Sequence, residues 1–302
     1  MSSIAILGPG GVGGFLATLL TRADEHVNVI AREPTAELIA AQGIALESVI
    51  FGELSARPLA APELISPTDF LLVAPKATAL SEALERIRVT PRLVVPVLNG
   101  LDHMAVLRAR FGDAHVAAGA IRIEADRPQP GRVVHTSPSV RVELAADDVT
   151  LAGEVRELGE ILKRAGIPTE IGVSEAQVLW SKLVRLAPLA CTTSAADRPI
   201  GFIRSDPHWR PVLKTAIAET AAVANADGAE IDPSGPLAEL DAAHPTLRSS
   251  MQRDIAAGRE PELDAIPGAV LRAAGRHGLR CPTMRRLVVR IEHRLKVAAR
   301  AR

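Results

Sequence analysis

The chain opens with a short apolar run that leads directly into a glycine-rich turn and then into a helical pattern. Ile4–Leu7 predicts a buried strand, Gly8-Pro9-Gly10-Gly11-Val12-Gly13 has the spacing G-x-G-x-x-G, and Val12–Arg22 predicts a helix. In this setting the first glycine permits the tight turn, the second lets the backbone approach a pyrophosphate, and the third lets the helix pack on the strand. The alternative is an ordinary glycine-rich turn. A second predicted strand at Val27–Ala31 completes a βαβ unit and favours a dinucleotide site.

The rest of the first half repeats short buried runs separated by helical patterns. Phe70–Ala74 and Leu93–Leu98 predict strands, with a helix at Leu80–Ile87 between them. Strands that are apolar throughout indicate a parallel sheet covered on both faces. Further strands are expected as a strand and a hairpin added to the edge of this sheet, with Arg127–Gly131 as turn material; they are Val116–Ile123, Arg132–His135 and Val140–Leu144.

Strand patterns stop after about Gly172. Ser174-Glu175-Ala176-Gln177 is a capping-box pattern that opens a helix. Later helices are expected at Pro211–Ala226, Pro236–Ala242, Leu247–Ala257, Pro261–His277 and Thr283–Ala299. The fold class is therefore α/β: an N-terminal doubly wound sheet of Rossmann type over residues 1–172, and a C-terminal all-α domain over 173–302 that holds substrate and catalytic residues.

Composition narrows the classes of protein. A chain of 302 residues suffices for two domains, and 35 basic against 35 acidic residues give no field that would attract nucleic acid. No apolar run approaches the ~20 residues that cross a bilayer. Cys191 and Cys281 are isolated, which suggests a reducing compartment, so we expect a cytoplasmic protein. The eight histidines show no paired ligand spacing, so no metal site is expected. The absence of tyrosine excludes any mechanism with a tyrosine proton donor.

The residues after the second strand bear on the choice of cofactor. NAD sites usually place an acidic residue there for the ribose 2′-hydroxyl, whereas a basic residue suits the 2′-phosphate of NADP. The chain reads Ala31-Arg32-Glu33. Arg32 offers a planar fork for a phosphate and favours NADP(H). Two alternatives stay open: Glu33 as the ribose ligand, and Arg32 as a plain surface residue.

Two polar residues follow buried strands. Lys76 comes after Leu71-Leu72-Val73-Ala74-Pro75, and Asn99 comes after Val94-Val95-Pro96-Val97-Leu98. Ligands of doubly wound sheets bind outside the carboxyl ends of the strands. Lys76 and Asn99 are therefore candidates for binding cofactor and substrate, against the alternative of exposed loop residues.

Lys182 is the third lysine of a chain that has only five. It lies three residues after Leu179 and four before Leu186, so it shares a helix face with apolar residues. Such a lysine either extends its amine to water or is held in a cleft. Glu262 follows Pro261 in the expected first turn of a helix, and Ser250 lies in Ser249-Ser250-Met251; taken singly, both are ordinary helix residues.

Together these positions resemble the ketopantoate reductase family over nearly the whole chain. The resemblance rests on the Gly8–Gly13 loop, Lys76, the Asn99-Gly100 pair, Leu179-Trp180-Ser181-Lys182-Leu183, the block from Ser249-Ser250-Met251 through Gly258-Arg259 to Glu262-Leu263-Asp264, and the stretch from Gly268 to Pro282-Thr283. It implies reduction of 2-dehydropantoate to pantoate with NADPH, a step toward pantothenate. A homodimer is the candidate assembly.

The resemblance also implies roles for single residues. Lys182 would protonate the alkoxide as hydride arrives, and Glu262 would hold substrate and orient the lysine. Ser250 would contact the substrate carboxylate, and Asn99 and Lys76 would line the nicotinamide end. Gly8, Gly10, Gly11, Val12, Gly13 and Arg32 would bind the rest of the cofactor.

One departure concerns the substrate. The family usually carries asparagines one and two turns after the lysine, where this chain has Leu186 and Ala190, with Pro188 between them. Three hypotheses follow: a 2-oxoacid reductase, with ketopantoate as the first substrate; the same mechanism on a less hydroxylated carbonyl or imine; and a redox sensor that binds NADP(H) without turnover. Joint retention of Lys182, Glu262 and Ser250 argues against the sensor.

Overall fold

The computed structural model describes residues 2–300, with the backbone alone for 298–300. The chain divides into two compact units, Met1–Val178 and Leu179–Arg302, called here the N-terminal and C-terminal units. The sequence placed this division near residue 172. In the structure it falls after Val178, inside helix α6 (Glu175–Ala196).

The central sheet of the N-terminal unit is parallel throughout. Within the described residues it holds five strands in the order β5-β2-β1-β6-β7. Their bounds are β1 Ser3–Leu7, β2 His26–Ile30, β5 Leu59–Ala61, β6 Phe70–Val73 and β7 Leu93–Pro96. From β1 the chain proceeds to one side through β2 and β5, and to the other side through β6 and β7. The order therefore reverses beside β1, which is the point where doubly wound sheets bind their ligands.

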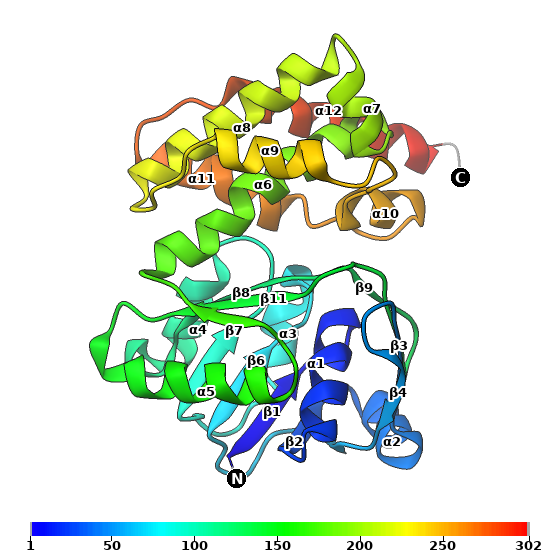
Figure 1. Ribbon diagram of the computed structural model, residues 1–302, viewed down its shortest axis with the longest axis vertical. Helices are drawn as coiled ribbons and strands as arrows, with labels where there is room; N and C mark the ends of the chain where they lie inside the picture. Colours follow the sequence, from blue (N-terminus) through cyan, green and yellow to red (C-terminus); the bar gives the residue numbers. More distant parts are fainter. Residues whose placement is uncertain (1, 301–302) are drawn as a thin grey trace. The chain divides into compact units, whose positions relative to one another are not determined.

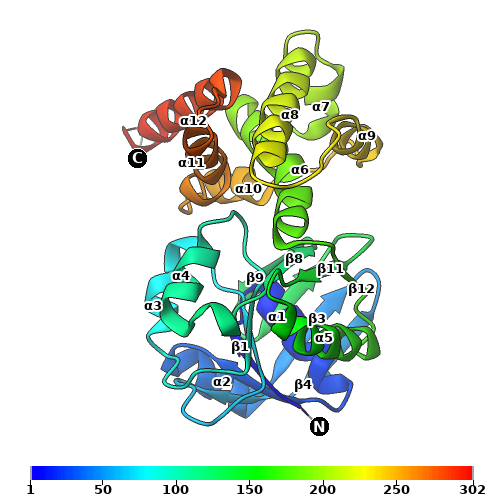
Figure 2. The ribbon, with the colours of Figure 1, turned by 90° about the vertical axis from the view of Figure 1, so that its left-hand side faces the viewer.

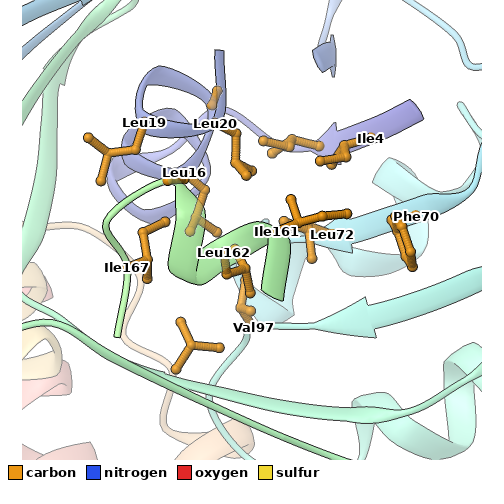
Figure 3. Close-up of a cluster of buried hydrophobic side chains, with 14 of the residues drawn as sticks. Ile4, Leu16, Leu19, Leu20, Phe70, Leu72, Val97, Ile161, Leu162 and Ile167 are labelled. Atoms are coloured by element: carbon orange, nitrogen blue, oxygen red, sulfur yellow. The ribbon is translucent and has the colours of Figure 1, made fainter. Parts of the chain in front are cut away.

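Helices cover both faces of this sheet, as the buried strand pattern predicted. Helices α1 (Gly11–Arg22) and α5 (Ala152–Arg164) pack on the face that carries Ile4 and Leu72. Figure 3 shows their apolar side chains gathered over that face, among them Leu16, Leu20, Ile161 and Leu162. Helices α3 (Leu80–Leu84) and α4 (His103–Phe111) lie on the opposite face (Figure 2). Each buried Leu or Ile contributes about 1.5–3 kcal/mol to such a core.

The remaining strands of this unit form two further sheets. One has the order β4-β3-β10-β9, and the other has the order β12-β11-β8. Their bounds are β3 Ile44–Ser48, β4 Gly52–Ala56, β8 Ala118–Arg122, β9 Ala125–Gln129, β10 Arg132–His135, β11 Arg141–Ala145 and β12 Thr169–Ile171, and helix α2 (Glu33–Gln42) precedes β3.

The prediction of a hairpin at the edge of the central sheet was therefore wrong, because β10 pairs with β3 and β9 while β11 pairs with β8 and β12. The expected strand Val116–Ile123 does meet that edge, through an isolated parallel bridge from Val116 to Val94 of β7. Arg127 was also expected in a turn, and it lies instead in β9, which pairs with β10. Strand β9 is an edge strand, so it tolerates Pro128, which lacks an N–H. The turn itself is short, and Gly131 takes it at a φ of +76°.

A buried histidine ties β10 to β3. His135 is 1% exposed, its Nδ1 lies 2.8 Å from Ser48 Oγ, and its Nε2 lies 2.9 Å from Ser137 Oγ. The Ser137 hydroxyl donates to the Ser139 carbonyl at 2.9 Å, so its oxygen accepts from Nε2–H, and Nδ1 accepts from Ser48. The neutral ring is thereby satisfied at both nitrogens. Burial lowers the pKa of His135 below its ordinary value.

The described part of the C-terminal unit is helical and contains no strand (Figure 1). Its helices after α6 are α7 Ile200–Ser205, α8 Trp209–Ala226, α9 Ser234–Ala242, α10 Ser250–Ala256, α11 Ala269–Arg276 and α12 Pro282–Arg300. Ser174 caps the start of α6 as predicted, because its Oγ accepts the Gln177 N–H at 3.1 Å. Among the described residues, no helix has the length and apolar character needed to cross a membrane.

Candidate active site

The glycine loop turns sharply at the carboxyl end of β1. Gly8 adopts a φ of +87°, a left-handed conformation that favours glycine. A Cβ on Gly8 would also lie 3.0 Å from the backbone nitrogen of Pro75, which precedes Lys76. The Gly10 N–H then donates to the Gly8 carbonyl at 2.8 Å, and this closes the turn ahead of α1.

The other glycines of the loop have different neighbours. A Cβ on Gly10 would meet no atom within 4 Å, whereas a Cβ on Gly13 would lie 2.2 Å from the Gly8 carbonyl oxygen. A Cβ on Gly11 would lie 2.1 Å from the Ala125 carbonyl oxygen. Gly13 and Gly11 are therefore required by packing, against the loop itself and against β9. Of these three glycines, only Gly10 has open space where a Cβ would lie. Val12, between Gly11 and Gly13, packs partly into the core.

The start of α1 suits a phosphate. Gly10 is the N-cap of this helix, and its first turn contains no acidic residue. The first N–H groups of a helix have no partner within it, and their dipoles favour an anion. With open space at Gly10, this terminus fits the pyrophosphate of a dinucleotide.

Arg32 and Glu33 occupy different structural positions. Arg32 is exposed and occupies the N-cap position of α2 without a side-chain capping bond, one residue beyond the buried Ala31 that follows β2. Glu33 is already the first residue of α2. Between β2 and α2, the residue at the position that usually distinguishes NADP from NAD is therefore Arg32 and not Glu33.

A second arginine, which sequence reasoning missed, lies at the same loop. Arg127 on β9 donates from Nη1 to the Pro9 carbonyl oxygen at 3.4 Å. The pKa of its guanidinium lies below the ordinary value, first because the group loses water and second because the positive charge of Arg32 is near. The sequence carried a misleading signal here, since Arg127-Pro128-Gln129-Pro130-Gly131 has the composition of a turn.

Lys76 and Asn99 follow neighbouring strands of the central sheet, as expected. The Ala74 N–H donates to the Leu7 carbonyl at 2.9 Å, and the Val97 N–H donates to the Val73 carbonyl at 2.9 Å. These bonds hold the ends of β6 and β7 beside the end of β1, where the glycine loop begins. Lys76 is exposed and immediately precedes a short 3-10 turn, and Asn99 is partly buried. The N-terminal unit thus brings the loop, Lys76 and Asn99 to one edge of its sheet.

Lys182 lies in the first half of α6, in the C-terminal unit. It is partly buried, between the buried residues Trp180 and Leu183. The Trp180 indole N–H donates to Asp227 Oδ2 at 2.9 Å, and Asp227 Oδ1 lies 2.6 Å from His277 Nε2. This contact fixes the rotation of α6 about its axis, and with it the face that presents Lys182.

Ser250 is the first residue of α10 and is partly buried. The preceding Ser249 caps that helix by accepting the Gln252 N–H at 3.1 Å. Its hydroxyl also lies 3.0 Å from the Thr193 hydroxyl of α6. Thr193 lies eleven residues after Lys182, which is about three turns and the same helix face. A buried hydroxyl pair thus attaches the serine segment to the lysine helix.

Glu262 is 7% exposed and lies just before an irregular turn. The helix expected over Pro261–His277 begins later, at Asp264, and is not a regular α-helix throughout. Instead a π-helical turn, η4 (Asp264–Gly268), leads into α11, and Glu262 contributes its carbonyl as acceptor for the Ile266 N–H at 3.0 Å. Pro267 lies inside this turn and has no N–H to continue a regular α-helical ladder. π-Helical turns are frequent at functional sites.

Comparison with known proteins identifies the family. The family model described as ketopantoate reductase PanE/ApbA matches residues 4–180, and the model of its C-terminal part matches residues 176–294. The chain belongs to the ketopantoate reductase family. Its members are oxidoreductases that use a nicotinamide cofactor on small oxoacids, and the chain is an oxidoreductase of this kind.

Individual relatives cover almost the whole chain. The chain is 31% identical over 294 residues to a 2-dehydropantoate 2-reductase of Caulobacter vibrioides, covering 93% of this chain and 95% of the relative. It is 27% identical over 292 residues to the uncharacterized oxidoreductase YkpB of Bacillus subtilis, covering 92% and 94%.

Among solved structures, 2-dehydropantoate 2-reductase of Geobacter metallireducens has a TM-score of 0.88 at 26% identity, covering 96% of this chain and 99% of that one. A D-mandelate dehydrogenase with NADH and anilino(oxo)acetate has the same TM-score at 20% identity, covering 97% and 98%, which shows a common fold.

The lysine helix of this chain has apolar residues one and two turns after Lys182. Leu186 is partly buried one turn after Lys182, and Ala190 is fully buried a further turn on. Pro188 lies inside α6 and cannot donate a hydrogen bond to the Val184 carbonyl. After Leu186 the next hydroxyl of the helix is that of Thr192, which donates to the Pro188 carbonyl at 2.6 Å.

Proposed function

We propose that this oxidoreductase reduces a 2-oxoacid to the 2-hydroxyacid with NADPH, and that 2-dehydropantoate, reduced to pantoate on the route to pantothenate, is the first substrate to examine. The observation that carries the proposal is the glycine loop at the reversal point of the sheet. Open space at Gly10 there faces the N-terminus of α1, which has no acid in its first turn. Family membership and the lysine helix of the C-terminal unit supply the reaction type.

NADPH is proposed over NADH because of Arg32. Its guanidinium follows β2 at the position where cofactor 2′-groups are read, whereas Glu33 has already entered α2. A guanidinium can make two parallel hydrogen bonds to a phosphate. A carboxylate at the same place would repel that phosphate and favour the free ribose hydroxyl.

When bound, the cofactor supplies a hydride to the carbonyl carbon of the substrate. As the C–H bond forms, the carbonyl π electrons move onto oxygen, and the resulting alkoxide takes a proton from Nζ of Lys182. The ammonium donates a hydrogen bond to that oxygen while negative charge develops on it, and this stabilises the transition state. The neutral amine of Lys182 then takes a proton from solvent before the next turnover.

The other site residues position the reactants. Glu262 is buried, so its carboxyl is suited to hold both the substrate and the Lys182 ammonium in a fixed orientation. Ser250 at the start of α10 is proposed to bind the substrate carboxylate. Lys76 and Asn99 are proposed to border the nicotinamide, where both cofactor and substrate are within their reach.

As an alternative, we propose a substrate with fewer hydroxyl groups than ketopantoate. The observation that favours this alternative is Leu186. Its apolar side chain stands one turn from Lys182, where a hydrogen-bonding group would read a substrate hydroxyl. An apolar wall discriminates by bulk alone, by about 1–3 kcal/mol per methylene.

Steady-state oxidation of NADPH and NADH against a panel of 2-oxoacids tests the proposal. We expect turnover with NADPH and at least one branched 2-oxoacid, and a smaller kcat/KM with NADH. Arg32→Ala should narrow the difference between the cofactors by weakening NADPH selectively. Tight NADPH binding without oxidation by any carbonyl substrate would instead support a redox sensor. Equal affinities for NADPH and NADH in the parent would refute the cofactor assignment.

A further inference from the structure

Strand β9 is built onto the glycine loop. The Cα of Gly11 lies so close to Ala125 that a Cβ there would be 2.1 Å from the carbonyl oxygen. Two residues on, Arg127 donates to the carbonyl of Pro9, which lies between Gly8 and Gly10. The β9–β10 register shifts between Asp126 and Gln129, so it is the hydrogen bond to Pro9, and not strand alternation, that places the Arg127 side chain on the loop.

Arg127 and Arg32 approach this loop from different elements. Arg32 follows β2, and Arg127 comes from β9 in a different sheet. The Gly8 N–H donates to the carbonyl of Ile30, two residues before Arg32, at 3.0 Å, and Arg127 is hydrogen-bonded to the next loop residue, Pro9. The fold thus brings both guanidiniums to one loop. Loss of water lowers the pKa of Arg127 most, and the positive charge of Arg32 lowers it further. A doubly charged anion bound at this loop would attract both side chains.

We propose that Arg127 is a second residue that selects the cofactor, and that it binds the 2′-phosphate of NADPH together with Arg32. This inference rests on the proposed function, because it names a further group of the same cofactor site. A phosphate monoester carries nearly two negative charges at neutral pH and has three acceptor oxygens, which suits two guanidinium forks. The hydrogen bond from Arg127 to Pro9 would hold the side chain over the loop before the cofactor arrives.

The pyrophosphate is the other anion that Arg127 could meet. It would lie against the N-terminus of α1, where backbone N–H groups would face it. The Gly8 bond to Ile30, two residues before Arg32, favours the ribose side of the loop for Arg127. The two assignments differ in a measurable way, because NADPH and NADH share the pyrophosphate and differ in the 2′-phosphate alone.

Equilibrium binding of NADPH and NADH to Arg127→Gln decides between them. Loss of one charge-assisted contact is expected to weaken NADPH by about ten- to a hundred-fold. NADH should change by less than about threefold. Arg132→Gln is the matched control, because it removes the same charge from the same hairpin, where Arg132 pairs with Glu47 at 3.2 Å. It should leave both affinities unchanged.

Competition with two nucleotides gives a second readout that does not involve the nicotinamide. Arg127→Gln should weaken adenosine 2′,5′-bisphosphate and leave adenosine 5′-monophosphate nearly unchanged. Equal weakening of NADPH and NADH would overturn the proposal and assign Arg127 to the pyrophosphate. Unchanged binding of both would overturn it as well, as would an equal effect of the Arg132 control.

These results separate the inference from the proposed function. If the parent protein binds neither cofactor, the proposed function fails. If the parent binds NADPH and turns it over while Arg127→Gln binds it equally well, the inference about Arg127 fails alone. Thermal unfolding of the variant without cofactor, expected within a few degrees of the parent, verifies that a loss of binding is not a loss of fold.

Discussion

Two adjacent glycines of the loop are expected to respond oppositely to the same substitution. A Cβ on Gly11 would lie 2.1 Å from the Ala125 carbonyl oxygen, and on Gly10 it would meet nothing within 4 Å. Real Cβ atoms stay beyond 3.0 Å, so Gly11→Ala must separate α1 from β9 by about 1 Å. Overpacking of this kind destabilises by about 1–3 kcal/mol. Gly10 has extended backbone angles that alanine also adopts, and losing glycine at an N-cap costs about 1 kcal/mol or less.

NADPH binding should be affected in the opposite way, with the larger loss in Gly10→Ala. The methyl group of Gly10→Ala occupies the space proposed for the pyrophosphate, so NADPH should bind at least tenfold more weakly, which is about 1.4 kcal/mol. Urea unfolding without cofactor measures the stability of both variants, and fluorescence titration with NADPH measures binding. A Gly11→Ala protein as stable as the parent would refute the packing argument. Unchanged NADPH affinity in Gly10→Ala would show that the pyrophosphate does not lie against this residue.

Three further outcomes are expected. Lys182→Ala should lower kcat by ~10²–10⁴-fold with NADPH binding intact, while Lys214→Ala on α8 should change neither; turnover within a few-fold of the parent would remove Lys182 as proton donor. The parent should distinguish ketopantoate from its deoxy analogue by less than about tenfold in kcat/KM, and Leu186→Asn should shift the ratio toward ketopantoate; a parent preference near 10⁴ would show that other groups read the hydroxyl. Because folding lowers the pKa of His135, the stability due to its neutral ring should be complete above the unfolded pKa of about 6.5 and should decline as pH falls below it. The unfolding free energy of His135→Gln should therefore be lower than that of the parent at neutral pH and should depend less on pH in that range. Parallel pH profiles of the two proteins would contradict this.

The parts of the site that could be predicted are those set by local pattern. The glycine spacing and the apolar runs around it placed the loop, and the same runs placed Lys76 and Asn99 at strand ends, because a parallel sheet brings its carboxyl ends to one edge. The capping serine at Ser174 was likewise readable, since its bond to Gln177 spans three residues. In each of these cases the deciding interaction lies within a few residues along the chain.

The parts that could not be predicted depend on distant contacts. Arg127 reaches Pro9 across more than a hundred residues, and its segment has the composition of a turn. Only its place at the edge of a sheet makes Pro128 acceptable in a strand. Glu262 was expected in the first turn of a regular helix, whereas the helix begins at Asp264 with a π-helical turn that contains Pro267. The roles of Gly10 and Gly11 were not separable, because the neighbour of Gly11 is a carbonyl of β9.

The most direct test of the proposed chemistry follows the transferred hydrogen. A single turnover with NADPH that carries deuterium at the transferred position of the nicotinamide, in the presence of the best 2-oxoacid from the panel, is analysed by mass spectrometry of the product. The account predicts a 2-hydroxyacid with one deuterium on the former carbonyl carbon, formed by the parent and formed far more slowly by Lys182→Ala. A product without the label, or no reduced product with any 2-oxoacid under conditions where NADPH binds, would contradict it.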